Sequence, residues 1–461
     1  MRAERIYTDL ISFLTITKCD IDKSVNQHGK AVIKGILKEN EDVMAKIADM
    51  TWIAIYAEGD NTSKTIFTGI VESMSTQDMN GSTECEIHIV GGTRLMDVEK
   101  KTKTFQNAAM TYQEIIAAAS SEYNAPFMGS EMLQTATNDF FVQYKETDWE
   151  FVVRMASNIR ASIIPDFSSL QTRYYVGLPE STDVFTCDSV EYIKKKEVNC
   201  LRNYAGRMVR NSEVDDVVSF THREILELGT PVDVENSRYY VYQIHSHWEK
   251  EEMVHTYELR RKTDFEVKKL NNFMLVGASM DAEIIDVQAA QVKVQVSVDA
   301  EQNVETARWF AYSSVFSSPD GTGWYCMPEI GDKVRVYFPS EEETDAYVIS
   351  SVHVDEGGGS RSNPDNKSLM NKFDKQVELT PTKITLTNGK GLTFEIDDEE
   401  GIKIISNTNI TFLAQELVQM VSLNNNVELD ALEQVVLSQN GNSIVLDGDV
   451  TIHAGQLHIQ E

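Results

Sequence analysis

The middle of the chain, from about Met280 to Val354, alternates hydrophobic and polar residues with a period of two. The run QVKVQVSV at Gln291–Val298 places valine at every second position, and similar alternation starts again at Val334 and at Ala346. This period predicts half-buried antiparallel strands. Several short strands close together in sequence, separated by glycine turns, are typical of a small Greek-key barrel of the OB type.

The N-terminal part of the chain, up to residue 267, shows the same period on both sides of a helical stretch. In the first hundred residues, β-rich runs separated by turn-like segments predict strands. These runs are Ala31–Leu37, Thr51–Ala57, Thr65–Val71 and Glu84–Val90. Strand patterns return between Cys187 and Val267. We therefore expect two similar β-domains, each an antiparallel barrel or sandwich, with helices between them.

Two capping-box motifs mark the starts of these helices. Thr111 and Glu114 open the segment TYQEIIAAASSEYN. Thr147 and Glu150 open the segment TDWEFVVRMAS in the same way. In the second segment, Trp149 begins a hydrophobic stripe with the spacing i, i+3, i+4 and i+7, which predicts one apolar helix face.

Acidic and histidine residues near these elements are candidates for chemistry. Glu146, Asp148 and Glu150 could be imagined as catalytic carboxylates, but acids in a first helical turn complement the helix macrodipole. Because the sequence identifies no partner group for them, we interpret them as structural. His245 and His247 have a spacing that some metal sites use, yet the sequence supplies no convincing third ligand, so we expect no metal there.

From residue 376 onward, short apolar pairs recur about every eight residues, separated by turns rich in Asn, Asp, Gly and Ser. These pairs and triplets are Val377/Leu379, Ile384/Leu386, Leu392/Phe394/Ile396, Ile402/Ile404, Ile410/Phe412, Val418/Met420, Val427/Leu429, Val435/Leu437, Ile444/Leu446, Val450/Ile452 and Leu457/Ile459. A zigzag ribbon of such strands leaves one apolar face uncovered. We expect this face to meet two further copies in a trimeric β-helix or β-prism, in preference to a single-chain β-helix with a thin core. The glycine-rich stretch at residues 355–375 is predicted to be a linker.

Charge and cysteine content narrow the possible partners. The net charge of −30 argues against nucleic acid, which needs a basic groove, and against an anionic membrane surface. The five cysteines are odd in number and lack a CxxC motif, which favours reduced thiols in a chain folded in the cytoplasm. The sequence shows neither a signal peptide nor a membrane-spanning apolar run. We therefore expect cytoplasmic assembly, no stable membrane anchoring and no use of the general secretory route.

Two segments resemble a known family. FVQYKETDWEFVVRMAS at Phe141–Ser157 is similar to the hub motif of VgrG-type spikes, the hub-and-needle proteins of contractile injection systems. These systems include type VI secretion, phage tails, R-type bacteriocins and extracellular relatives. GTGWYCMPEIGDKVRVYFPS at Gly321–Ser340 resembles the motif of their OB domain. The residues that carry the resemblance, as fold and assembly positions with no chemistry implied, are Trp149, Trp309, Trp324, Pro328, Gly331 and Asp332.

The resemblance implies a mainly β homotrimer that joins a hexameric tail tube to a threefold needle. We expect a hub of two β-barrels with intervening helices at residues 1–267, an OB barrel at 268–354, the linker at 355–375 and a trimeric β-needle at 376–461. Such a chain is a structural central spike with no enzyme activity and no cofactor or metal. Its expected partners are further copies of itself and the tail tube and baseplate proteins.

Two other functions remain as alternatives. A hub with peptidoglycan hydrolase activity would need a hydrolase domain, and none is visible in the sequence. A trimeric tail-spike that binds polysaccharide would carry paired carboxylates on the needle. Asp397–Glu400 is the only acidic run there, and we interpret it as a solvated turn.

The last repeats, Val450–Glu461, end without a globular cap or an effector domain. A bare prism end exposes strand edges, so the resemblance favours a separate cap protein or effector at the tip. The alternative is a metal on the threefold axis, held by three copies of His453 or His458. Strand alternation argues against the metal, because the apolar residues on either side of each histidine take the inward face.

Overall fold

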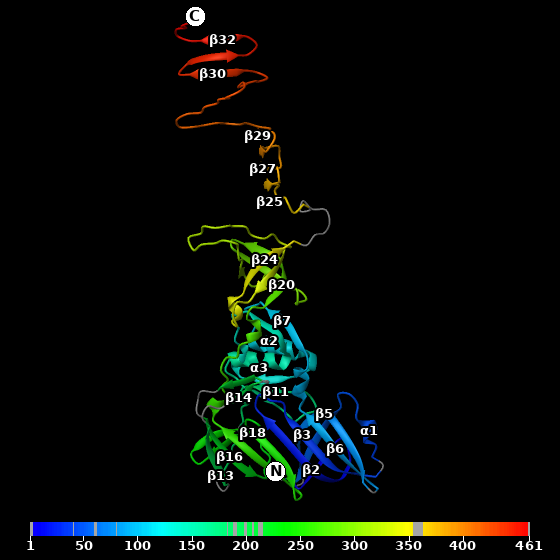
Figure 1. The fold of residues 1–461 in the computed structure, drawn as a ribbon. Coiled ribbons are helices and arrows are strands. Elements are labelled where there is room, and N and C mark those ends of the chain that lie inside the picture. Colours follow the sequence, from blue (N-terminus) through cyan, green and yellow to red (C-terminus); the bar gives the residue numbers. More distant parts are fainter. Residues whose placement is uncertain are drawn as a thin grey trace. The chain divides into compact units, whose positions relative to one another are not determined.

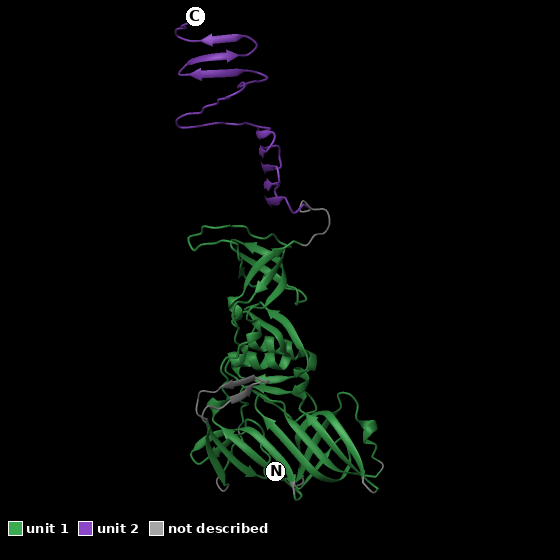
Figure 2. Ribbon diagram, in the orientation of Figure 1, with its two compact units in different colours: residues 1–354 green, residues 355–461 purple. Residues whose placement is uncertain are grey.

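The computed structural model describes residues 3–39, 41–59, 62–79, 81–181, 183–187, 191–197, 201–204, 207–210, 215–353 and 363–459. The chain divides into two compact units, residues 1–354 and residues 355–461 (Figure 2). In both units the regular secondary structure consists mainly of strands, as predicted (Figure 1). Within the described ranges, no helix is both long enough and apolar enough to cross a membrane.

The hub contains one sheet of twelve strands with the order β1-β4-β5-β6-β3-β2-β18-β19-β16-β13, and β12 and β17 attach to it beside β18. The strands are β1 (Arg5–Thr8), β2 (Phe13–Ser24), β3 (Lys30–Leu37), β4 (Trp52–Gly59), β5 (Thr62–Met79), β6 (Ser82–Val90), β12 (Phe185–Thr186), β13 (Tyr192–Glu197), β16 (Asp215–His222), β17 (Pro231–Val234), β18 (Ser237–Glu249) and β19 (Glu252–Arg260). The short helix α1 (Val43–Lys46) lies between β3 and β4 in sequence. The two predicted β-domains share this sheet, because Asp20–Ser24 of β2 pairs with Gln243–His247 of β18.

Alternation explains which faces of these strands are buried. In β3, every second residue from Ala31 to Leu37 is buried, and β19 shows the same period. Ile33, Phe67 and Tyr257 are among the buried residues of the single core that this sheet encloses.

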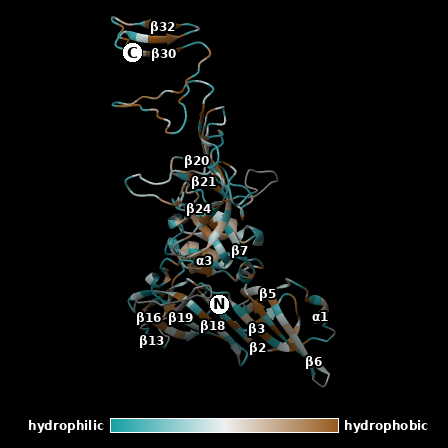
Figure 3. Cartoon of the chain, turned by 45° about the horizontal axis from the view of Figure 1, so that its top comes forward, coloured by the Kyte–Doolittle hydropathy of each residue, from teal (hydrophilic) through white to brown (hydrophobic). Residues whose placement is uncertain are grey.

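Between β6 and β12 in sequence, the chain forms a region of helices and short strands. It contains α2 (Tyr112–Ser120), α3 (Asp148–Asn158), the 3-10 turns η1 (Gly92–Asp97), η2 (Ser121–Tyr123) and η3 (Glu131–Gln134), the strand pair β7 (Lys100–Phe105) and β9 (Phe141–Thr147), and the small sheet β10 (Ile163–Pro165), β11 (Tyr174–Val176) and β8 (Phe127–Gly129). Both predicted capping boxes are present, with Thr111 and Thr147 as N-caps. The hydrophobic residues around α3 form a second core (Figure 3). A separate hairpin joins β14 (Leu201–Tyr204) to β15 (Arg207–Arg210).

The predicted small barrel follows the turns η4 (Lys262–Phe265) and η5 (Phe273–Leu275). Its strand order is β22 (Phe310–Ala311), β21 (Gln291–Val296), β20 (Ser279–Gln288), β23 (Lys333–Tyr337) and β24 (Tyr347–Val352), with η6 (Glu343–Asp345) before β24. A bridge between Tyr312 and Val348 connects the first and last strands of this order, so the sheet closes. The alternating valines of β21 are fully buried inside it.

The second unit is a pair of antiparallel ribbons. The first ribbon runs β25 (Lys367–Met370), β26 (Gln376–Leu379), β27 (Lys383–Thr387), β28 (Thr393–Asp397) and β29 (Gly401–Ile405). The second runs β30 (Val435–Gln439), β31 (Asn442–Leu446) and β32 (Val450–His453). β25 lies inside the stretch that was predicted to be a linker. Between Ile405 and Val435, where all residues are described, the chain forms no strand.

Candidate assembly surfaces

A buried ion cluster joins the hub to the OB barrel. Arg154 of α3 donates through Nε and Nη2 to Glu146, at 3.0 and 2.8 Å, and through Nη1 to Glu343 Oε1 at 2.6 Å. All three side chains are almost completely buried. Burial alone would lower the pKa of Arg154, but the charges of the two carboxylates outweigh burial and raise its pKa above the usual value.

Hydrogen bonds and aromatic packing add further contacts between the hub and the OB barrel. Asp299 of the OB barrel accepts from the backbone N–H of Thr104 at 2.9 Å and from its hydroxyl at 2.5 Å. Phe140, which precedes β9, packs edge-on against Phe310 of the barrel with ring centroids 5.3 Å apart. Phe140 and Val142 belong to the core of the OB barrel itself. The hub and the barrel therefore share buried polar and apolar contacts.

The three acids near α3 have more specific partners than the sequence indicated. Glu150 completes the capping box, as expected. Asp148 instead binds Lys101 Nζ at 2.7 Å and accepts from Tyr123 at 2.8 Å, and Glu146 lies before the helix and pairs with Arg154. The sequence alone identified no partner for Glu146 or Asp148, whereas the structure gives each of them a cationic partner. Sequence reasoning missed the partners because they lie on other elements of the fold.

Trp149 and Trp309 take different positions in the first unit. Trp149 is buried in the core around α3, where its ring lies 4.8 Å from that of His28 and 6.4 Å from that of Tyr174. Trp309 lies on the OB barrel, with Lys293 Nζ 4.8 Å from its ring centroid.

The remaining OB motif residues form an exposed aromatic loop and a tight turn. Trp324 is 63% exposed, whereas Pro328 is buried. Gly331 has a φ of 95°, a left-handed conformation that favours glycine, and its N–H donates to Ile284 O at 2.9 Å. Asp332 accepts through its carboxylate from Glu329 N at 2.9 Å and so closes the turn before β23.

The first ribbon of the second unit has one apolar and one polar face. In the pairing register, Val377 lies opposite Leu386, Leu386 opposite Phe394 and Phe394 opposite Ile404. A second row of opposed residues, on the same face, runs across the strands beside the first. It contains Leu379, Ile384, Ile396 and Ile402. The opposite face carries Glu378, Thr385, Glu395 and Lys403. Because side chains alternate across a strand, the apolar rows form one continuous surface, and most of their side chains are exposed in the single chain.

The second ribbon repeats this arrangement and locates one of the tip histidines. Ile444 lies opposite Leu437 and Ile452, and Leu446 lies opposite Val450. His453 lies opposite Ser443, on the other face from Ile452. His458 lies beyond the last strand, and both histidines are exposed in the single chain.

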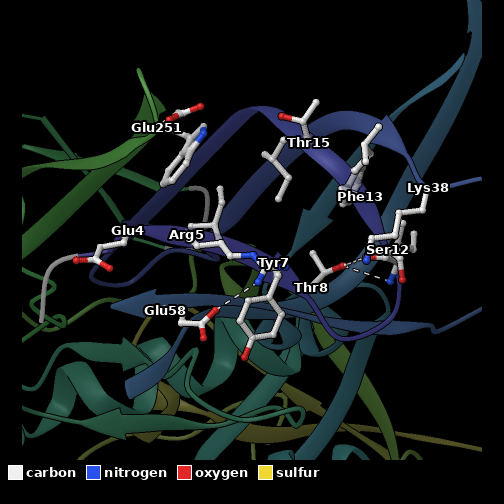
Figure 4. Close-up of a pocket in the computed structure, with 15 residues that line it drawn as sticks. Glu4, Arg5, Tyr7, Thr8, Ser12, Phe13, Thr15, Lys38, Glu58 and Glu251 are labelled. Carbon is white, nitrogen blue, oxygen red and sulfur yellow. Dashed lines mark hydrogen bonds and ion pairs between the residues drawn. The ribbon is translucent and has the colours of Figure 1, made fainter. Parts of the chain in front are cut away.

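An open pocket of about 550 Å³ lies where β1 and the first part of β2 diverge, between their separate partners β4 and β3 (Figure 4). Arg5 lies 3.7 Å from Glu58 on its wall, and the Thr8 hydroxyl donates to Ile11 O at 2.7 Å. Trp248 also lines it. We interpret the pocket as an open seam in the sheet.

The histidine pair considered for a metal has other neighbours. His245 Nδ1 lies 2.6 Å from Asp22 Oδ1, and the rings of His245 and His247 are 6.1 Å apart. Among the described residues, no three His, Cys, Asp or Glu side chains are grouped as metal ligands.

Comparisons with known proteins agree with this architecture. Residues 41–159 match the family model of the phage tail baseplate hub (GPD). Residues 282–353 match that of the type VI secretion system/phage-baseplate injector OB domain. None of the curated proteins matches the chain in sequence.

Two solved structures share the fold at low sequence identity. The E. coli c3393 protein is a component of the type VI secretion system that exhibits structural similarity to the T4 bacteriophage tail proteins gp27 and gp5. It superposes with a TM-score of 0.53 and 11% identity, over 76% of this chain and 100% of its own. A chain of the Francisella PdpA–VgrG complex gives a TM-score of 0.57 and 10% identity, over 84% of this chain and 83% of its own. Both matches cover most of this chain and confirm the predicted hub-and-spike fold.

Proposed function

We propose that this chain, a baseplate hub and spike protein by its two family matches and its fold, is the central spike of a contractile injection system. In this role the hub nucleates the tail tube, and the ribbons of the second unit form the needle that punctures the target envelope. The observation that carries the proposal is the continuous apolar face of the ribbons, described above, which has no cover in the described part of the chain.

The apolar face supports a homotrimer. A monomer would expose rows of Val, Leu, Ile and Phe to water, whereas three ribbons around an axis can bury these rows against one another. At about 25 cal/mol per Å² of apolar surface removed from water, burial of such rows favours association. The polar face with Glu378 and Lys403 then forms the outside of the needle.

The buried contacts between the hub and the OB barrel, centred on Arg154, are consistent with a protein that transmits force along its axis. Because Arg154 contacts carboxylates from both parts, the OB barrel and the hub would move as one body under axial load. The partners of this body are the tail tube and other baseplate proteins, and a separate cap protein or effector covers the needle tip. The trimer assembles in the cytoplasm before it enters an injection particle.

The function is structural and involves no catalysis. The acids that were candidates for catalysis are engaged in a capping box and in ion pairs. A hub with peptidoglycan hydrolase activity is the alternative, and a zymogram with purified protein would detect it.

Light scattering on the purified chain tests the proposal. We expect a particle of about 3 × 52.0 = 156 kDa. A chain shortened by removal of Val377–Glu461 should trimerise more weakly, with the first unit still folded. A stable particle of 52.0 kDa for the full chain would contradict the proposal.

A further inference from the structure

The open pocket of the hub lies between two strand edges (Figure 4). β1 and β2 are the two ends of the strand order β1-β4-β5-β6-β3-β2 and follow each other in sequence. In the described part of the chain, β1 pairs only with β4, and β18 pairs with β2 only from Asp20 onward, so Phe13–Cys19 has no partner on the side away from β3. In the OB barrel a bridge between Tyr312 and Val348 closes the sheet, but no such bridge joins β1 to β2 among the described residues.

The backbone of β1 directs polar groups into this pocket. Asp9 N donates to Ala54 O at 3.4 Å, in the register of the ladder between β1 and β4. Because N–H and C=O groups alternate sides along a strand, those of Ile6 and Thr8 point away from β4 and towards the pocket, which both residues line. A ligand in the pocket would therefore meet the hydrogen-bonding edge of a strand.

The two edges lack the charges that protect the other end of the sheet. The edge strand β13 carries three consecutive exposed lysines, Lys194–Lys196, which discourage pairing with a further strand. The stretch Phe13–Thr17 of β2 contains no charged residue, and its Leu14 is 70% exposed. This side of β2 is therefore suited to pairing with an added strand.

The two walls of the pocket limit what can occupy it. A strand between β1 and β2 pairs on both of its sides, so it must bring two free edges. The edge strand of a folded sheet, such as β13 of a second copy, has only one free edge, because its own sheet takes the other. The pocket therefore fits a single extended segment of about four to six residues, as four residues of β1 form one wall.

The side chains of the lining favour a particular kind of segment. Ile6 and Trp248 contribute apolar side chains, which favour apolar residues on one face of an added strand. Glu4 and Glu251 lie at one end of the pocket, and Lys38 lies at the other (Figure 4). A segment with a basic residue at the first end and an acidic residue at the second complements these charges.

We infer that this pocket is a strand-addition site, which binds an extended segment of a partner protein between β1 and β2. The segment alternates apolar and polar residues and carries charges of opposite sign at its two ends. Its backbone joins the two edges, so the first half of the sheet closes and the exposed edges are covered. The inference goes beyond the proposed spike function, and it holds for a monomer as well as for a trimer.

Synthetic peptides added to the purified full chain test the site. The probes are fluorescein-labelled KTVTVTE and ETVTVTK, which place the two charges at opposite ends and so cover both strand directions. A third peptide repeats the tighter binder with N-methyl groups on alternate residues, which blocks the backbone donors of one edge. Fluorescence anisotropy should show that one of the first two peptides binds with a Kd below about 1 mM. The N-methylated peptide should bind about tenfold more weakly or worse, because it loses several hydrogen bonds.

Hydrogen exchange and charge variants locate the bound peptide. The peptide should slow amide exchange in the segment Glu4–Ile16, which includes the inward N–H groups of Ile6 and Thr8. Glu251→Lys should weaken binding about threefold to tenfold, because it places a like charge beside the basic end of the peptide. The matched control Glu399→Lys makes the same change at an exposed turn of the second unit and should leave binding unchanged.

Three results would overturn the strand-addition site. They are no binding of either peptide at about 1 mM, equal binding of the N-methylated peptide, and binding that Glu251→Lys leaves unchanged. Slow exchange of Glu4–Ile16 in the protein without peptide, together with no binding, would show that a second copy already fills the pocket, and would overturn the assignment to a partner protein. Light scattering on the same samples tests the proposed function separately. A monomer that binds the peptide would refute the trimer and keep the site, whereas a trimer that does not bind it would refute the site alone.

Discussion

At the scale of single residues, Arg154 and Glu343 show how two parts of the chain are joined by charge, although 189 positions separate them. Removal of the arginine would leave two carboxylates buried without their cation. An uncompensated buried charge is far more costly than a broken pair in water. The joint therefore depends on Arg154 more than on any exposed ion pair.

We expect Arg154→Ala to lower the free energy of unfolding by about 3–5 kcal/mol. The matched control is Arg335→Ala, because Arg335 pairs with Asp281 at 2.7 Å on the surface, where the two side chains are 39% and 72% exposed. Such a pair contributes about 0–1 kcal/mol. Urea denaturation at one protein concentration measures both variants, and equal losses would show that the ion cluster does not hold the joint.

His255 predicts a pH dependence of the hub. It is buried, its Nδ1 lies 2.7 Å from Ser246 Oγ, and burial lowers its pKa from 6.5 to about 3, with the charge of Lys23 acting in the same direction. Below pH 6.5 the unfolded chain binds a proton at this residue and the folded chain does not, so stability falls as the pH falls towards 3. Between the two pKa values the slope approaches about 1.4 kcal/mol per pH unit.

The variant His255→Asn removes this titration. We expect its melting temperature to fall less between pH 7 and pH 5 than that of the parent chain, whatever its stability at pH 7. Because Lys64, Glu227 and His222 also face His255, the difference between the two proteins is the relevant measurement. Equal falls in both proteins would mean that His255 does not carry the pH dependence.

At the scale of elements, the stability of the proposed trimer depends on which face of a needle strand carries a charge. Leu386 lies on the apolar face of β27, and Thr385 lies on the polar face between Glu378 and Glu395. We expect Leu386→Lys to abolish the trimer, because each copy would bury an ammonium group at a cost of several kcal/mol. Thr385→Lys should keep the trimer, since its charge meets two carboxylates in solvent. Light scattering on both variants at low concentration decides this, and a stable Leu386→Lys trimer would contradict the proposed packing.

Some helices and strands could be predicted from the sequence alone, because their patterns involve only neighbouring residues. Thr111 and Thr147 mark helix starts because a capping box depends only on residues three apart, and the valines of β21 mark a buried strand because alternation is local. The pairing of β2 with β18, and the cluster around Arg154, depend on contacts between distant segments, which no local pattern encodes. β25 was missed because its apolar residues, Leu369 and Met370, are adjacent and so give no alternating pattern.

At the scale of the whole molecule, the proposed needle would expose one edge of β32, the last strand among the described residues. In the described part of the chain, β32 pairs only with β31, so its other edge is open. An open edge invites further strand pairing, and a partner protein at the tip would remove this hazard. A metal on the threefold axis would require three inward imidazoles, but the register places His453 on the face opposite Ile452.

We therefore expect elemental analysis of the purified trimer to find less than one tightly bound transition metal per trimer. His453→Ala and His458→Ala should leave both the metal content and the trimer unchanged, because neither side chain lies at the axis in this arrangement. Thr451→Ala is the matched control for His453→Ala, as Thr451 lies on the same face of β32 as His453. One iron or zinc per trimer that is lost in either histidine variant, and kept in the control, would reverse the inward and outward faces assigned to the tip. It would also indicate an axial ion in place of a separate cap protein, since three histidine nitrogens can bind iron or zinc and leave further coordination positions on the ion open.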